Sequence, residues 1–364
     1  MDKKLGVGVI GCGNISTIYL TNLSNMFSNT KVVACADMFY ERAVETAKKF
    51  NIPRAQTVEE LINNPEVDVV LNITIPKAHY EISKAALLAG KHVYTEKPLA
   101  LEVSEGKELV DLAKEKGLYL GCSPDTVLGG SIQTCRDAID SGLIGKPLSA
   151  TVTFHWHGPE HEHPNPGFLY QYGAGPIFDY GPYYFTTLVT LLGPVKQVCS
   201  MAGKGFDTRT CTCPGPNNGK EFPVEIPTHV TGAALMENGV LATVIQSWDM
   251  WATSEAEYAI FGTEGTLYVP DPDKYGEPAY LLRKGAAQPE ELPNTHHYNT
   301  NSRGLGISEM IASISEGKQP IASGEVGLHV LEVMHAFTES AERQAFVTIK
   351  STCERPEAFG RKTL

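Results

Sequence analysis

The sequence contains no long hydrophobic run and no cluster of basic residues within its 364 residues. Because no apolar stretch approaches the roughly 20 residues of a membrane-spanning helix, we predict no transmembrane segment and no membrane partner. Acidic residues outnumber basic ones by 42 to 30, which gives a net charge of −12. A surface that binds nucleic acid is therefore not expected.

The cysteines also lack a recognisable framework. Eight are scattered along the chain, several of them in apolar, strand-like stretches. We therefore expect reduced thiols and a cytoplasmic location. Cys211 and Cys213 form a close pair, but no second Cys or His pair stands at the spacing that a four-ligand zinc site needs. We predict no metal there and assign the pair to a loop.

Length and hydrophobic pattern predict two domains, because 364 residues exceed a typical single core. Up to residue 123, short apolar strands alternate with helices, as in a parallel, doubly wound sheet. The predicted strands are 5–10, 31–36, 67–75, 91–95 and 118–122, and the predicted helices are 41–50, 58–63, 79–89 and 104–116.

From residue 124 the pattern changes to longer strands, which predicts a large, mostly antiparallel open sheet backed by helices. Its strands are expected at 148–157, 195–203, 228–237, 241–249 and 255–262. Its helices are expected at 130–141, 180–192, 305–316 and 325–343. The segments 157–175 and 208–220 are predicted to be loops.

A glycine-rich turn, Gly11-Cys12-Gly13-Asn14-Ile15-Ser16, joins the first strand to a helix. Glycines there permit a tight turn and close approach of a pyrophosphate, which then lies at the helix N-terminus. The next strand ends at Asp37, whose carboxylate would accept hydrogen bonds from the adenosine ribose and repel a 2′-phosphate. The alternative is that Asp37 merely begins a loop. We predict a Rossmann domain in residues 1–123 that binds NAD rather than NADP.

Further cofactor contacts are expected at the carboxyl ends of later strands, where ligands of doubly wound sheets bind. The predicted cofactor-binding residues are Gly11, Gly13, Asn14, Ile15, Asp37, Arg42, Thr74, Pro76, His79, Glu96 and Lys97. For His79 an exposed surface position is the favoured alternative.

Three further stretches carry a family resemblance. They are GKHVYTEKPLA at 90–100, GPIFDYGPYY at 175–184 and SGEVGLHVLE at 323–332. With the glycine-rich turn, they make the chain resemble the Gfo/Idh/MocA family of glucose–fructose oxidoreductase, inositol dehydrogenase and rhizopine-catabolism proteins over nearly its whole length. The resemblance implies that residues 124–364 form an α/β domain that binds substrate and whose open sheet faces a partner subunit, in a homodimer or homotetramer.

The resemblance also implies catalytic roles for Lys97, for Asp179 and for Tyr183, which stands where most members have His. Asp179 and Tyr183 are spaced i, i+4, so on one helix they would share a face. Free Tyr has a pKa of about 10, so it needs a nearby cation, such as Lys97, to act as a base in its phenolate form. A flanking His is the alternative base, and Asp179 could instead be a helix N-cap.

A polar segment before residue 175 supplies candidate substrate contacts. His155 and His157 would point to one side of a strand and Trp156 to the other, and His163 follows in the loop. The predicted substrate-binding residues are Lys97, Asp125, His155, His157, His163, Asp179 and Tyr183. The histidine cluster could alternatively be a solvated loop or bind a metal.

These observations predict an NAD-dependent oxidoreductase that acts on a secondary alcohol of a sugar, glycoside or cyclic polyol. One alternative is a glycoside-cleaving enzyme in which tightly bound NAD oxidises the sugar transiently and so permits elimination. Another is an NAD-binding sensor without catalysis. The sequence leaves open which carbohydrate or polyol is the substrate.

Overall fold

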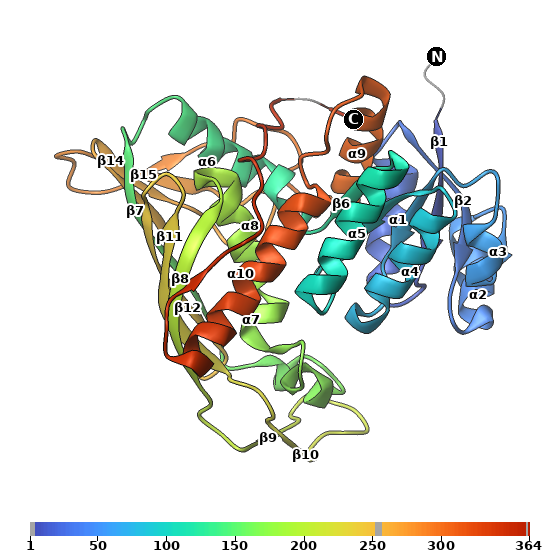
Figure 1. Ribbon diagram of the computed structural model, residues 1–364, viewed down its shortest axis with the longest axis horizontal. Coiled ribbons are helices and arrows are strands. Elements are labelled where there is room, and N and C mark those ends of the chain that lie inside the picture. The colour runs from blue at the N-terminus through green and yellow to red at the C-terminus, as the bar shows by residue number, and fades with distance from the viewer. Residues whose placement is uncertain (1–3, 252–256, 362) are drawn as a thin grey trace.

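A computed structural model of the protein describes residues 4–251, 257–361 and 363–364. It contains two large sheets, which occupy opposite ends of the molecule in Figure 1. Helix α10 (Gly324–Arg343) lies between them.

The first sheet has six parallel strands in the order β3-β2-β1-β4-β5-β6, which confirms the predicted doubly wound topology. The strand order reverses between β1 and β4, and ligands of such sheets bind in the crevice at that point. The strands are β1 (Leu5–Ile10), β2 (Thr30–Ala36), β3 (Ala55–Gln56), β4 (Val69–Asn72), β5 (His92–Thr95) and β6 (Leu120–Cys122).

Helices cover both faces of this sheet, so its central strands are buried on both sides. Val69, Val70 and Leu71 of β4 are all inaccessible to solvent. The covering helices are α1 (Ser16–Asn25), α2 (Tyr40–Phe50), α3 (Val58–Ile62), α4 (Pro76–Leu88) and α5 (Val103–Lys116). Helix α4 begins three residues earlier than predicted, because Pro76 suits the first position of a helix.

The second sheet has nine strands in the order β16-β15-β14-β13-β7-β12-β11-β8-β17. All neighbours are antiparallel except β7 and β12, which confirms a mostly antiparallel sheet. Its strands are β7 (Pro147–His155), β8 (Val195–Gly203), β11 (His229–Met236), β12 (Leu241–Ser247), β13 (Tyr258–Gly262), β14 (Gly265–Tyr268), β15 (Ala279–Arg283), β16 (Glu290–Leu292) and β17 (Val347–Thr348).

The sequence pattern missed several short strands, including β14, β15 and β16. It also assigned 208–220 to a loop, whereas β9 (Thr208–Thr210) pairs with β10 (Glu221–Pro223). The start of the strand predicted at 255–262 lies outside the described residues, and its remainder is β13.

The nine-stranded sheet has an inner and an outer face. Val152 and Phe154 point inward and are buried near α8 (Gly181–Leu192), whereas Thr151 and Thr153 alternate to the outer face. On β8, the backbone N–H of Ser200 donates to the Ser340 hydroxyl of α10, which places α10 on the inner face as well.

The C-terminal helices return to the first sheet. The backbone N–H of Cys122 in β6 donates to the carbonyl of Ala322, just before α10. Asn22 of α1 donates to the carbonyls of Asn301 and Arg303, just before α9 (Leu305–Glu316). Residues far beyond position 123 therefore border the predicted cofactor domain, and this arrangement positions the site described below.

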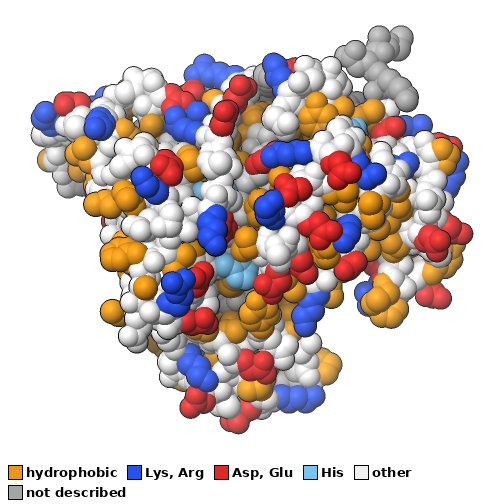
Figure 2. Space-filling model, in the orientation of Figure 1, with side chains coloured by type: hydrophobic (Ala, Val, Ile, Leu, Met, Phe, Trp, Pro, Cys, Tyr) orange, Lys and Arg blue, Asp and Glu red, His pale blue; other side chains and the backbone are white. Residues whose placement is uncertain are grey.

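Acidic and basic side chains intermingle over the face shown in Figure 2. Among the described residues, no helix is long and apolar enough to cross a membrane. The remaining helices are α6 (Gly130–Asp140) and α7 (Gly175–Asp179).

Candidate active site

The glycine-rich turn has the shape that a pyrophosphate requires. Gly11 directly follows β1 and has a φ of +107°, and a Cβ there would lie 2.6 Å from the carbonyl oxygen of Ile73. A Cβ on Gly13 would meet open space, so that side of the turn is free for an approaching group. The Ser16 hydroxyl donates to the carbonyl of Gly13 at 2.6 Å and closes the turn as α1 begins. These residues fit a dinucleotide.

Asp37 directly follows β2 and keeps hydrogen-bonding capacity. Its two carboxylate oxygens accept the backbone N–H groups of Cys12 (2.8 Å) and Phe39 (2.9 Å). Each oxygen retains a lone pair for a ribose hydroxyl. The guanidinium of Arg42 lies 4.7 Å from the centre of the Phe39 ring, one turn further along.

His79 has a different environment from the one predicted. It is buried, and its Nδ1 and Nε2 lie 2.7 Å and 3.1 Å from the carbonyl oxygens of Pro98 and Thr74. The favoured surface position is therefore wrong. Burial lowers the pKa of this imidazole. His79 links the loops that follow β4 and β5 rather than presenting its ring to a ligand.

Glu96 orients the residue that follows it. One carboxylate oxygen accepts the Tyr19 hydroxyl of α1 at 2.6 Å, and the other accepts the backbone N–H of Lys97 at 2.9 Å. Glu96 thus connects helix α1 to the segment that follows β5.

Lys97, Asp179 and Tyr183 come together, although they derive from opposite parts of the chain. The Lys97 ammonium lies 2.8 Å from the Asp179 carboxylate and 2.7 Å from its backbone carbonyl. The same nitrogen lies 5.1 Å from the centre of the Tyr183 ring. Although burial opposes it, the Asp179 carboxylate raises the pKa of Lys97 above its usual value, so the ammonium stays charged.

Asp179 and Tyr183 do not share one helix as predicted. Asp179 ends α7, and Tyr183 lies in the first turn of α8. The helical hydrogen bonding is interrupted at Tyr180, because Pro182 has no N–H to continue the hydrogen bonds of α7. Both side chains nevertheless reach Lys97.

In the site without cofactor, Lys97 alone does not keep Tyr183 as a phenolate. Burial raises the pKa of Tyr183 above its ordinary value near 10, more strongly than Lys97 lowers it. The phenol is therefore protonated at neutral pH. It is a proton donor in the resting site.

Two charged residues beside Tyr183 were not predicted. Nη2 of Arg303 donates to the Tyr183 hydroxyl at 3.4 Å and to the Asp273 carboxylate at 2.7 Å. Both lie in irregular segments far from position 183, so no sequence motif indicated them.

An aromatic surface adjoins Tyr183. Tyr180 stacks on Phe154 with ring centres 4.1 Å apart, and it lies 5.8 Å from Trp156 and 6.3 Å from Tyr183. Tyr180 and Trp156 are both half-buried. The alternation expected for the predicted strand at 148–157 placed Trp156 opposite its neighbouring histidines, which was the one available signal for this surface.

The predicted histidine contacts lie elsewhere. His155 alternates with Phe154 and so belongs to the outer face of the sheet, away from the aromatic surface. His157 stacks on Trp251 with ring centres 3.4 Å apart. The structure therefore contradicts a shared orientation of both imidazoles toward substrate.

His163 and Asp125 have structural partners. His163 accepts the backbone N–H of Asn165 at 3.0 Å. Asp125 is 2% exposed, and its carboxylate accepts the backbone N–H groups of Gly304 (2.8 Å) and Gly306 (3.0 Å) as well as the Tyr275 hydroxyl. Asp125 thus holds the start of α9 rather than contacting substrate.

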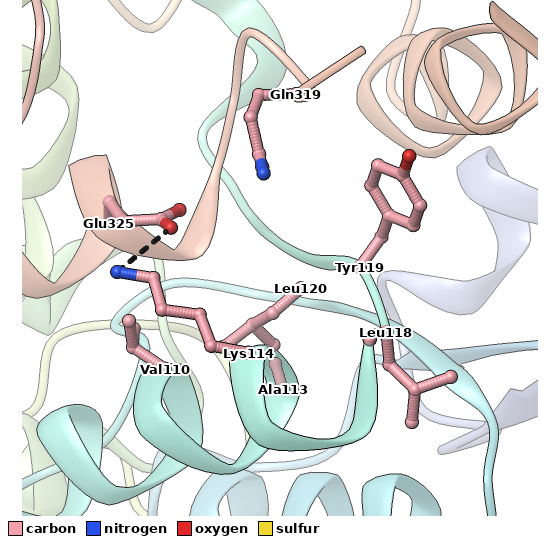
Figure 3. Close-up of a pocket in the computed structure, with 9 residues that line it drawn as sticks. Val110, Ala113, Lys114, Leu118, Tyr119, Leu120, Gln319 and Glu325 are labelled. Carbon is pink, nitrogen blue, oxygen red and sulfur yellow. Dashed lines mark ion pairs between the residues drawn. The ribbon is translucent and has the colours of Figure 1, made fainter. Parts of the chain in front are cut away.

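Within the described residues, no group of three His, Cys, Asp or Glu side chains is placed to hold a metal ion. A separate cavity of about 280 Å³ lies between α5, β6 and the start of α10, where Lys114 pairs with Glu325 at 3.4 Å (Figure 3). This ion pair joins two of the residues that line the cavity, and Lys97 is not among them.

The glycine-rich turn, Asp37 and the Lys97 cluster define an oxidoreductase that binds NAD on a Rossmann domain. Residues 5–123 match the oxidoreductase family model with an NAD-binding Rossmann fold, and residues 132–268 match the GFO/IDH/MocA C-terminal domain. The chain belongs to the Gfo/Idh/MocA family.

Relatives match more than nine-tenths of the chain. Myo-inositol 2-dehydrogenase of Thermotoga maritima is 31% identical over 349 residues, which cover 94% of this chain and 98% of that protein. 1,5-Anhydro-D-fructose reductase of Ensifer adhaerens is 28% identical over 347 residues, covering 92% and 95%. A levoglucosan dehydrogenase solved with NADH and levoglucosan has the same fold, with a TM-score of 0.81 at 20% identity over 96% of this chain and 100% of that one.

Proposed function

We propose that the protein is an NAD-dependent dehydrogenase or reductase that interconverts a neutral secondary alcohol of a sugar, glycoside or cyclic polyol with its ketone. The observation that carries this proposal is the contact of Lys97 with Asp179 beside the Tyr183 ring, above the crevice of the first sheet. The relatives named for inositol and anhydrofructose support the substrate class.

The three side chains have complementary roles. An ammonium has three N–H donors, and Lys97 directs two of them to Asp179, which leaves the third for a substrate oxygen. Tyr183 exchanges a proton with that oxygen. Asp179 orients and neutralises Lys97. NAD, held by Gly11, Gly13 and Asp37, would accept the hydrogen of the reacting carbon as hydride or return it as NADH.

Charge balance favours a neutral substrate. The two cations that flank Tyr183 are each offset, Lys97 by Asp179 and Arg303 by Asp273. A phosphorylated or carboxylated substrate would need an unpaired cation. Tyr180 and Trp156 instead offer aromatic rings to the C–H face of a pyranose or cyclitol.

The proposed assembly and location follow from the outer sheet face and the thiols. The outer face of the nine-stranded sheet carries Leu241 and Met201, which are 58% and 77% exposed in the single chain. We propose that a second copy covers this face in a homodimer or homotetramer.

All eight cysteines are free thiols, which supports a cytoplasmic location.

The test is a screen of the purified protein with NAD or NADH against neutral polyols, anhydrosugars, glycosides and their ketones. Absorbance of NADH that changes with substrate supports the proposal. Release of an aglycone without accumulation of NADH would instead support the glycoside-cleaving alternative. NAD binding without turnover of any compound would favour a sensor.

A further inference from the structure

Two cations flank Tyr183, and only one of them contacts its oxygen. Lys97 donates two hydrogen bonds to Asp179, and its nitrogen lies 5.1 Å from the centre of the Tyr183 ring. Arg303 donates an Nη2 proton to the phenolic oxygen itself, at 3.4 Å. The side chain of Arg303 is 15% exposed, so this contact is little weakened by water.

We propose that Arg303 is the positioning residue that stabilises the Tyr183 phenolate, and that Lys97 serves the substrate oxygen. This inference rests on the proposed role of Tyr183 in proton transfer. When a ketone is reduced, hydride that NADH would supply forms the new C–H bond, and the carbonyl oxygen takes the proton of Tyr183. The Tyr183 O–H bond breaks, the alcohol O–H bond forms, and the negative charge that the hydride brought passes to the phenolic oxygen. The hydrogen bond from Arg303 then becomes charge-assisted and shortens.

Arg303 keeps its charge in this environment. A guanidinium is not deprotonated in proteins, and the Asp273 carboxylate, 2.7 Å away, offsets the cost of burying this one. A permanently charged guanidinium with a fixed fork suits an oxygen that alternates between neutral and anionic.

The surrounding segments hold Arg303 against Tyr183. Asp125 accepts the N–H of Gly304, the residue after Arg303, and also the hydroxyl of Tyr275, two residues beyond Asp273. One buried carboxylate thus fixes both segments. This gives Asp125 an indirect role in the site in place of the predicted substrate contact.

Nearby charges act on the Tyr183 phenol in both directions: Lys97 and, less strongly, Arg303 lower its pKa, whereas Asp273 and Glu96 raise it. Because cations and carboxylates shift the pKa of Tyr183 in opposite directions, variants of Arg303 and Asp273 can test the role of Arg303. Arg303→Gln and Asp273→Asn break the same ion pair. If the pair is merely structural, both variants should change the site in the same direction. If Arg303 stabilises the phenolate, Arg303→Gln raises the pKa of Tyr183 and Asp273→Asn lowers it.

The direct readout is a fluorinated tyrosine at position 183, whose more acidic phenol is titrated by ¹⁹F NMR in the intact protein. Arg303→Gln should raise its pKa by about 1 to 2, and Asp273→Asn should lower it. This titration needs no substrate, so it stands even if the proposed reaction fails. Equal pKa values in the parent and Arg303→Gln proteins, or shifts of the same sign in both variants, would overturn the proposal.

Kinetics provide the second readout. Arg303→Gln should slow ketone reduction by about 10- to 100-fold, with little further loss when Tyr183 is already Phe, because residues that act as one unit are not additive. Arg303→Lys, which keeps the charge, should recover part of the rate. The matched control is Arg283→Gln, which breaks an exposed arginine pair with Glu290. Full additivity with Tyr183→Phe would contradict the proposal.

Discussion

The ammonium of Lys97 lies 2.8 Å from the carboxylate of Asp179, 82 positions later in the sequence. Lys97 follows the fifth strand of the first sheet, and Asp179 ends a short helix of the second half. The contact therefore forms only when the two halves are in place. It also aims the remaining donor of Lys97 beside Tyr183, where the proposed chemistry occurs.

Replacement of Tyr183 tests the proton donor. Tyr183→Phe should slow the chemical step by about 10²- to 10⁴-fold, the usual range for loss of acid–base catalysis. NADH affinity should stay unchanged. The control is Tyr184→Phe, because Tyr184 is the next residue of α8 and packs on Phe154 inside the sheet. Single-turnover kinetics measure the step, and near-normal turnover in Tyr183→Phe would remove it from catalysis.

The pH dependence should differ between the two directions of reaction. Burial raises the pKa of Tyr183, so the phenol is protonated at neutral pH. Ketone reduction uses this form and should be insensitive to pH between about 6 and 9. Alcohol oxidation uses the phenolate and should accelerate by about tenfold per pH unit in that range. A plateau of kcat/KM for oxidation below pH 8 would show a more acidic base.

Asp37 should determine cofactor preference. Asp37→Ala should weaken NAD binding by about 1.5–3 kcal/mol for each ribose hydrogen bond lost, and it should improve the relative affinity for NADP. Titration calorimetry with both cofactors measures this change. Glu45→Ala, on the exposed face of α2, is the control. Identical NAD affinity in Asp37→Ala and the parent protein would place Asp37 outside the site.

The outer face of the nine-stranded sheet should form the subunit interface. Thr243 and Ile245 of β12 lie beside Ala233 and Thr231 of β11 on that face. Thr243→Arg would place a charge there, and dissociation to monomers with unchanged secondary structure is expected. Light scattering at micromolar concentration measures the mass. Ser24→Arg, at an exposed position of α1, should leave the measured mass unchanged. A monomeric parent protein would contradict the proposed interface.

Local sequence determined much of the fold and part of the site. The alternation of strands and helices predicted five of the six strands of the first sheet, because these strands are short, mostly apolar runs. It missed β3, which has only two residues. The glycine-rich turn and Asp37 lie within one βαβ unit, so the spacing between them could be recognised from the sequence.

Other parts depend on contacts between distant segments. Arg303 and Asp273 lie in irregular segments, and only tertiary folding brings them to Tyr183. The histidines were misjudged because β7 ends at His155, after which strand alternation no longer orients His157. Asp125 looked available as a polar residue in a linker, but its carboxylate accepts the buried backbone N–H groups of Gly304 and Gly306 at the start of α9.

The most direct test of the proposed function follows the hydrogen that leaves the alcohol carbon. A polyol that is deuterated at its carbinol carbons is incubated with the protein and NAD, and the resulting NADH is analysed by mass spectrometry. We expect NADH that carries one deuterium from the substrate, and loss of this product in Lys97→Met. NADH without deuterium, or aglycone release with no NADH formed, would contradict it.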